Sequence, residues 1–134
     1  MITEDYVSFD TAKLLKEKWF KFIEDKDELS KAYIHAYTKE GKEVWGCYSP
    51  DYYPCITMNM AMKWLREVHN LYIELNWEKG NQLYSFQIWK PRKFGPEISS
   101  LDLWRIYKDD HYPGEWKYEQ ACEEAIKYSL KHLI

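Results

Sequence analysis

The sequence has few cysteines and no apolar stretch long enough to cross a bilayer. Its three cysteines, Cys47, Cys55 and Cys122, form no CxxC pair, and their odd number excludes complete disulfide pairing within one chain. This usage is typical of a reducing compartment, so we expect a cytoplasmic protein. No run approaches the ~18 apolar residues of a membrane span. The acidic start, MITEDYVSFD, also lacks the regions of a signal peptide, so we expect no membrane partner.

The chain also lacks an excess of positive charge. Its formal net charge is −3, which supplies no overall attraction to nucleic acid or to acidic lipid. Hydrophobic residues make up 46% and charged residues 31% of the 134 positions, as in folded globular proteins. The unusual figure is the aromatic content of 18%, with seven Trp and twelve Tyr residues. Such side chains join an apolar body to a polar group, which suits sheet faces and interfaces.

The common catalytic and metal-binding motifs are absent. The sequence contains no GxSxG, HExxH, GxxxxGK[ST] or GxGxxG. Its four histidines and three cysteines are scattered singly, without chelating spacing. Cys122 falls on the apolar stripe of a predicted helix, where a thiol is inert, whereas Cys55 falls in a predicted loop and is the thiol worth testing. Because the reactive side chains are dispersed along the chain, we expect no enzyme, no cofactor and no metal.

Hydrophobic periodicity predicts the element order α-β-β-α-β-β-β-α. Helical spacing covers 7–23, 57–69 and 117–134, and strand alternation covers 31–38, 43–48, 71–77, 83–89 and 101–107. Ser8 and Thr57 suit helix N-caps, and Asn70 suits the left-handed residue that ends a helix. His69 is interpreted as structural, since no Cys, Asp or second His lies three or four residues away. We predict a single α+β domain over residues 1–134, with an antiparallel sheet of about five strands covered by helices.

Three segments resemble one protein family. They are VSFDTAKLLKEK, MAMKWLREVHNLYI and YEQACEEAIKYSLKHLI. The family consists of short uncharacterised proteins of gut bacterial genomes, their prophages and other mobile elements. Its members begin VSFETAKLLKEKGF, so Trp19 stands where the family often has Gly, which predicts a longer first helix. The resemblance implies no established activity, and it favours an accessory protein of phage or mobile-element type over a housekeeping enzyme.

The aromatic content leads to a first hypothesis, a non-catalytic protein-interaction module. Exposed aromatic side chains would contact an unknown protein partner or a second copy of the chain, because Tyr and Trp supply large contact areas at low entropic cost. The segment YSPDYYPC, with Tyr48, Tyr52 and Tyr53, is the predicted interaction surface. The alternative is that a small sheet protein uses its aromatic residues as core.

The second hypothesis is nucleic-acid binding by aromatic residues of the sheet and a basic loop. The stacking residues would be Tyr33, Tyr37, Trp45, Tyr84 and Phe86, and the phosphate contacts Lys90, Arg92 and Lys93. The last five predicted elements follow the order of double-stranded RNA-binding domains, which bind phosphates with basic residues at the start of the final helix. That helix here begins at Lys117 and continues with Glu119, Glu123 and Glu124. The order of the elements is similar, but the basic residues that would bind phosphate are missing at the start of this helix. The first hypothesis is therefore preferred.

Overall fold

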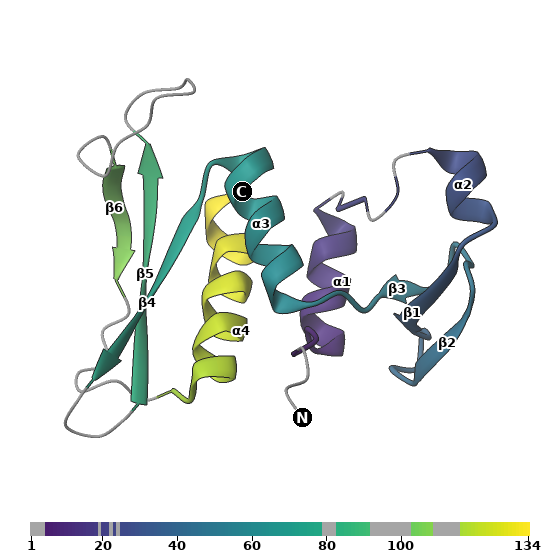
Figure 1. Ribbon diagram of the computed structural model, residues 1–134, viewed down its shortest axis with the longest axis horizontal. Helices are drawn as coiled ribbons and strands as arrows, with labels where there is room; N and C mark the ends of the chain where they lie inside the picture. Colours follow the sequence, from purple (N-terminus) through teal and green to yellow (C-terminus); the bar gives the residue numbers. More distant parts are fainter. Residues whose placement is uncertain are drawn as a thin grey trace. The chain divides into compact units, whose positions relative to one another are not determined.

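The computed structural model describes residues 5–18, 20–21, 23, 25–78, 83–91, 103–108 and 116–134, apart from the side chains of residues 78 and 103. Within these residues the chain is an α+β protein with four α-helices and two three-stranded antiparallel sheets (Figure 1). It divides into two compact units, Met1–Met60 and Ala61–Ile134. The predicted single sheet of about five strands is therefore replaced by two sheets, each paired within its own part of the sequence. The prediction of a single domain stays a prediction.

The first unit contains two helices and the sheet β2–β1–β3. Its elements are α1 (Phe9–Glu17), α2 (Lys26–Ser30), β1 (Tyr33–Tyr37), β2 (Glu43–Cys47) and β3 (Tyr53–Pro54). Ser8 begins α1 as predicted, since its hydroxyl accepts a hydrogen bond from the Thr11 amide at 3.3 Å. The helix ends at Glu17, where the backbone of Lys18 leaves the helical conformation, so the prediction of a helix as far as residue 23 is wrong.

The hairpin of the first unit follows the predicted alternation. β1 pairs antiparallel with β2, and the turn between them contains Gly41 at φ +83°, a conformation that favours glycine. Ile34 and Ala36 are buried, whereas the alternate residues of β1 are partly or largely exposed. The short elements α2 and β3 are not predicted, because α2 has no buried residue and β3 has only two residues, too few for a periodic signal.

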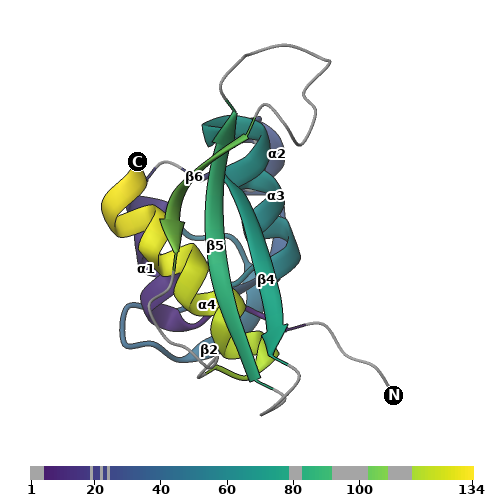
Figure 2. The same ribbon diagram turned by 90° about the vertical axis from the view of Figure 1, so that its left-hand side faces the viewer.

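The second unit places its sheet β4–β5–β6 against the last helix. Its elements are α3 (Met58–His69, whose first three residues belong to the first unit), β4 (Tyr72–Glu78), β5 (Leu83–Pro91), β6 (Leu103–Lys108), α4 (Tyr118–Tyr128) and the π-helical turn η2 (Ser129–Leu133). In Figure 2 the sheet faces the viewer and α4 crosses behind it. The Thr57 hydroxyl caps α3 by accepting from the Met60 amide at 3.1 Å, and Asn70 ends the helix at φ +55°, both as predicted.

The core of the second unit lies between this sheet and α4. Phe86 and Ile88 of β5 are buried, and Tyr107 of β6 stacks on Tyr128 of α4 with 3.6 Å between ring centroids. The residues buried on α4 and η2 are Ala121, Cys122, Ala125, Ile126, Ser129 and Leu130. The burial of Cys122 confirms its predicted place on the apolar stripe of this helix. No helix among the described residues combines the length and apolar character needed to cross a membrane.

Candidate functional site

The tyrosines predicted as an interaction surface are half-buried, and two of them contact α1. Tyr48, Tyr52 and Tyr53 all have intermediate exposure. The Lys16 ammonium donates a hydrogen bond to the Tyr52 carbonyl at 2.9 Å and lies over the Tyr53 ring, 4.8 Å from its centroid. Phe9 contacts Tyr53 edge to face, with 5.6 Å between centroids. Burial at these contacts lowers the pKa of Lys16 from its ordinary value of 10.5. This loop therefore belongs largely to the packing of the first unit.

The residues predicted to contact nucleic acid belong to two different sheets. Tyr33, Tyr37 and Trp45 lie on β1 and β2, whereas Tyr84, Phe86 and Lys90 lie on β5. Phe86 is only 3% exposed, and Tyr84 packs edge to face on Tyr118. Lys90 is exposed, while Arg92 and Lys93 lie outside the described residues. The structure therefore does not bring the predicted stacking residues onto one sheet.

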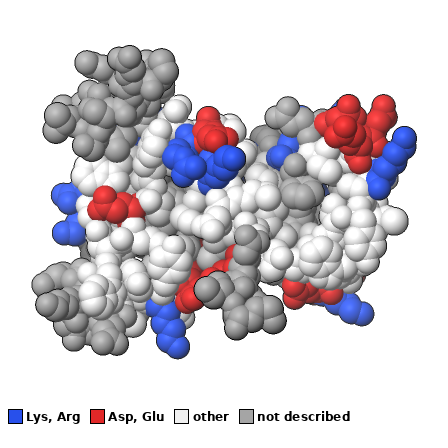
Figure 3. All heavy atoms as spheres, in the orientation of Figure 1, with Lys and Arg blue, Asp and Glu red and all other residues white. Residues whose placement is uncertain are grey.

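Charged side chains of both signs are interspersed on the surface. Within each unit, the described Lys and Arg residues on the face that Figure 3 shows form small separate groups. Among the described residues, Lys39 pairs with Asp51 at 3.4 Å and Lys63 with Glu67 at 4.0 Å. Exposed pairs of this kind contribute little to stability, and they provide no obvious track for a phosphate backbone.

The most distinctive surface feature of the first unit is a small pocket beside the β1–β2 hairpin, called the aromatic pocket below. Its volume is about 160 Å³. It is lined by Tyr6, Tyr33, Ile34, His35, Trp45, Pro54, Cys55, Ile56, Thr57 and Met60. Two of these residues are unusually accessible for their size, since Tyr33 is 69% and Trp45 is 60% exposed. The pocket thus joins a mainly apolar lining to two exposed aromatic rings.

The antiparallel register explains how the pocket residues meet. His35 lies directly opposite Trp45, and because alternate residues of a strand face the same side, Tyr33 and Glu43 share that face. The imidazole of His35 packs against two aromatic rings. It stacks on Trp45 with 4.3 Å between centroids, and it forms a T-shaped pair with Tyr6 at 4.7 Å and 86°. The side chain of His35 is 7% exposed, so the ring has little freedom to turn.

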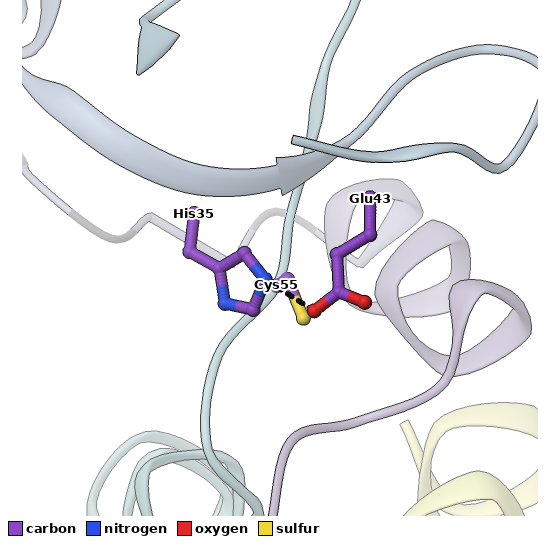
Figure 4. Close-up of side chains that lie close together, drawn as sticks. All are labelled: His35, Glu43 and Cys55. Carbon is purple, nitrogen blue, oxygen red and sulfur yellow. Dashed lines mark hydrogen bonds and ion pairs between the residues drawn. The ribbon is translucent and has the colours of Figure 1, made fainter. Parts of the chain in front are cut away.

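The side chains of Glu43 and Cys55 converge beside this ring. His35 Nε2 lies 2.5 Å from Glu43 Oε1, and Cys55 follows β3, where its amide donates to the His35 carbonyl at 2.9 Å. The ligating atoms of His35, Glu43 and Cys55 all lie within 4.8 Å of one another. Figure 4 shows the carboxylate and the thiol on the Nε2 side of the imidazole. We call these three residues the His–Glu–Cys cluster.

This cluster corrects the expectation that the reactive side chains are dispersed. Its imidazole, carboxylate and thiol come from three strands or strand ends and meet in space. The closeness of His35 and Glu43 follows from the predicted hairpin, since they lie on one face two positions from direct opposition. The position of Cys55 depends on β3, which pairs Pro54 with Ala36 and carries no signal of its own in the sequence. Cys55 and Cys122 are both buried, Cys122 as predicted, whereas Cys47 is exposed.

The geometry of the cluster differs from that of a nucleophilic triad. In a triad the nucleophile and the carboxylate contact opposite nitrogens of the imidazole, so that a proton passes through the ring. Here Glu43 contacts Nε2, the side on which Cys55 also lies, and Nδ1 is buried without a hydrogen-bond partner among the described residues. The arrangement suits the binding of one central ion better than the relay of a proton.

A second hollow, of about 520 Å³, lies between the sheet and α4 of the second unit. Its lining consists of Phe86, Tyr107, Trp116, Glu124, Lys127, Tyr128, Lys131 and His132. The charged residues among these are of mixed sign, and three or more metal-ligating groups gather nowhere in the described chain except at the His–Glu–Cys cluster. The first unit therefore contains the stronger candidate site.

No protein-family model, curated protein or solved structure matches the chain.

Proposed function

We propose that the chain is a non-catalytic interaction module that binds a partner protein through the aromatic pocket. The observation that carries this proposal is the exposure of Tyr33 (69%) and Trp45 (60%) beside a mainly apolar hollow. Tyr and Trp dominate the binding energy of protein interfaces, because they bury large areas and lose few rotatable bonds. The surface predicted from Tyr48, Tyr52 and Tyr53 would then lie beside the main contact rather than form it.

The size of the pocket favours a side chain over a cofactor. Small-molecule and cofactor sites usually measure about 300–1,000 Å³. The aromatic pocket measures about 160 Å³, close to the ~150 Å³ of an apolar cavity that accepts benzene. One large apolar side chain of a partner therefore fits it, whereas a nucleotide or a flavin does not.

The surroundings of Trp45 prepare it for binding. Its indole lies flat on the His35 ring, which is itself confined by Tyr6, so the exposed ring has a fixed orientation before a partner arrives. Side chains that are ordered in advance lose less entropy on association. An accessory protein of phage or mobile-element type, which the sequence resemblance favours, would use such a rigid contact to act on a host or phage protein.

A displayed library of random peptides provides the test. Peptides enriched on the wild-type chain should share one large apolar residue, and they should bind the Trp45→Ala variant at least about tenfold more weakly, since an interface anchor typically contributes ~2 kcal/mol or more. The matched control is Trp77→Ala, because Trp77 is similarly exposed (54%) but lies on β4. Equal binding by wild-type and Trp45→Ala protein would overturn the proposal.

Binding of the pocket to a second copy of the chain is tested separately. Light scattering of the wild-type chain reports whether the mass rises above 16.4 kDa with concentration. A rise that Trp45→Ala abolishes and Trp77→Ala retains would identify the partner as a second copy of the chain. The nucleic-acid hypothesis stays an alternative, which no contact of the described residues favours.

A further inference from the structure

We propose that the His–Glu–Cys cluster of His35, Glu43 and Cys55 is a binding site for a divalent transition metal of the zinc class. This inference is independent of the proposed function, because it concerns a metal ion bound at the wall of the aromatic pocket rather than the partner of that pocket. The cluster draws its ligands from β1, β2 and the residue after β3. Among the described residues, no other three potential metal ligands lie this close together.

The donor set selects the metal. An imidazole nitrogen, a thiolate sulfur and a carboxylate oxygen together match the ligands that zinc takes in proteins. Magnesium and calcium require oxygen ligands throughout, so a thiol and an imidazole count against them. With a doubly charged cation, one thiolate, one carboxylate and a neutral imidazole balance the charge to zero, which lowers the cost of placing the ion beside an apolar pocket.

The spacing of the cluster is close to that of a tetrahedral site. Zinc–ligand bonds of about 2.0–2.3 Å at tetrahedral angles place neighbouring ligand atoms about 3.5 Å apart. The three ligating atoms lie within 4.8 Å of one another, and the His35–Glu43 contact is shorter, at 2.5 Å. A side-chain rotation of Glu43, which is 58% exposed, can lengthen this short contact. The Cys55 sulfur lies within 4.8 Å of both other ligating atoms, so a small shift of the three groups completes the geometry.

The two buried ligands are held in place by their surroundings. The His35 ring is confined by Trp45 and Tyr6, which fix its plane in place of the carboxylate that often orients a metal-binding histidine. The Cys55 backbone is hydrogen-bonded to His35, and its sulfur lies 3.8 Å from the Val7 carbonyl. On binding, the S–H bond of Cys55 breaks as the sulfur–metal bond forms, and the proton leaves to solvent. Three protein ligands leave a fourth position for water.

Cobalt titration tests the site directly. The reference protein is the Cys47→Ser variant, which removes the exposed thiol of β2 from the measurement. Addition of Co²⁺ under reducing conditions should give one equivalent of a species with sulfur-to-cobalt charge-transfer absorption and intense tetrahedral bands, and Zn²⁺ should abolish both. Adding Cys55→Ser should remove the charge-transfer band. Adding Glu43→Gln should weaken binding by at least the ~10- to 100-fold that loss of a residue merely orienting a ligand costs. Glu40→Gln, in the exposed turn of the same hairpin, is the matched control and should bind as the reference does.

A stability measurement covers the case in which Cys55→Ser fails to fold. Zinc that binds only the folded chain raises its melting temperature, so the reference protein should be stabilised by Zn²⁺ and the Glu43→Gln variant much less. Because Glu43 is exposed, we expect its substitution to leave the fold intact. The proposal is overturned if no charge-transfer band appears, if the band survives Cys55→Ser, or if Glu43→Gln and Glu40→Gln bind cobalt equally. None of these results bears on peptide binding by Trp45, so the two proposals fail separately.

Discussion

The imidazole of His35 lies flat against the indole of Trp45, with 4.3 Å between ring centroids and 3° between ring planes. The two residues are directly opposed across β1 and β2, so a single cross-strand pair joins a nearly buried ring to a largely exposed one. This pair links both proposals, since Trp45 is the anchor of the aromatic pocket and His35 is a ligand in the His–Glu–Cys cluster.

Removal of the indole should cost the first unit a measurable part of its stability. Aromatic pairs contribute about 0.5–1.5 kcal/mol beyond the area they bury, so we expect Trp45→Ala to lower the free energy of unfolding by about 1 kcal/mol. Trp45→Phe, which keeps a flat ring over His35, should recover most of that loss. Denaturant unfolding followed by circular dichroism measures both variants, and equal losses would show that the stacking is not what stabilises the hairpin.

Two glycines of the same hairpin should respond in opposite ways to alanine. Gly41 has φ +83°, and a Cβ there would lie 2.8 Å from Cδ2 of Phe9. Left-handed backbone at a residue with a side chain costs on the order of 1–3 kcal/mol, so Gly41→Ala should destabilise the chain by at least that amount. At Gly46 a Cβ meets nothing within 4 Å.

Gly46→Ala is therefore the control for the turn. A glycine within a strand is less favourable than alanine by about 0.5–1 kcal/mol, so this variant should be as stable as the wild type or slightly more so. Thermal unfolding of the two variants compares them directly. If Gly41→Ala proved as stable as Gly46→Ala, the left-handed turn and its contact with Phe9 would both be in doubt.

The buried face of α3 gives a second matched pair. Leu65 is fully buried, whereas Val68, one turn away, is 57% exposed. Truncation of a buried leucine removes its transfer energy and leaves a cavity, so Leu65→Ala should cost about 2–5 kcal/mol. Val68→Ala should change stability by no more than about 0.5 kcal/mol. Urea midpoints of the two variants test this, and similar midpoints would contradict the assignment of the helix face.

The local structure of this chain is largely predictable from the sequence. Period-two alternation locates the five longer strands, and polar caps locate helix ends, as at Ser8, Thr57 and Asn70. Pairing between strands is harder, because alternation shows which face of a strand is apolar but not which neighbour it joins. The first sheet is completed by β3, which has only two residues inside a tyrosine- and proline-rich segment. Because so short a strand gives no periodic signal, the sequence does not reveal the division into two sheets.

The same limit applies to the candidate site. The closeness of His35 and Glu43 follows from one hairpin with a short turn, which the sequence indicates. The amide of Cys55 donates a hydrogen bond to the His35 carbonyl, and that contact depends on the path of the loop from β2 to β3. A search for chelating spacing along the sequence therefore misses a cluster built across three strands.

Oligonucleotides should not bind the chain in a salt-dependent manner. The net charge is −3 and Phe86 is buried, so neither phosphate attraction nor stacking on β5 is favoured. Fluorescence anisotropy with labelled single- and double-stranded DNA and RNA at low salt provides the measurement. Binding that weakens with salt and with Lys90→Gln would establish the nucleic-acid hypothesis in place of the interaction module.

The stability of the chain should decrease as the pH is lowered, because of His69. Its imidazole packs edge to face on Trp64 at 4.7 Å, and its Nε2 is buried without a hydrogen-bond partner among the described residues. Burial lowers the pKa of His69 from its ordinary value of 6.5, since the charged form loses its hydration. In the window between 6.5 and the lower folded pKa, the unfolded chain binds a proton that the folded chain does not. The contribution of His69 to stability is therefore complete above that window and is lost as the pH falls through it.

Urea unfolding of the wild type and of His69→Gln between pH 5 and pH 8 isolates this effect, because the variant removes the one imidazole concerned and leaves the carboxylates unchanged. The difference in unfolding free energy between the two proteins should be constant above about pH 7, where a histidine of ordinary pKa is neutral, and should shift in favour of the variant as the pH falls. Val68→Ala, which alters a neighbouring residue without a titratable group, should keep the wild-type slope. A wild-type slope in His69→Gln would place the pH sensitivity on other residues and leave the burial of this ring without energetic consequence.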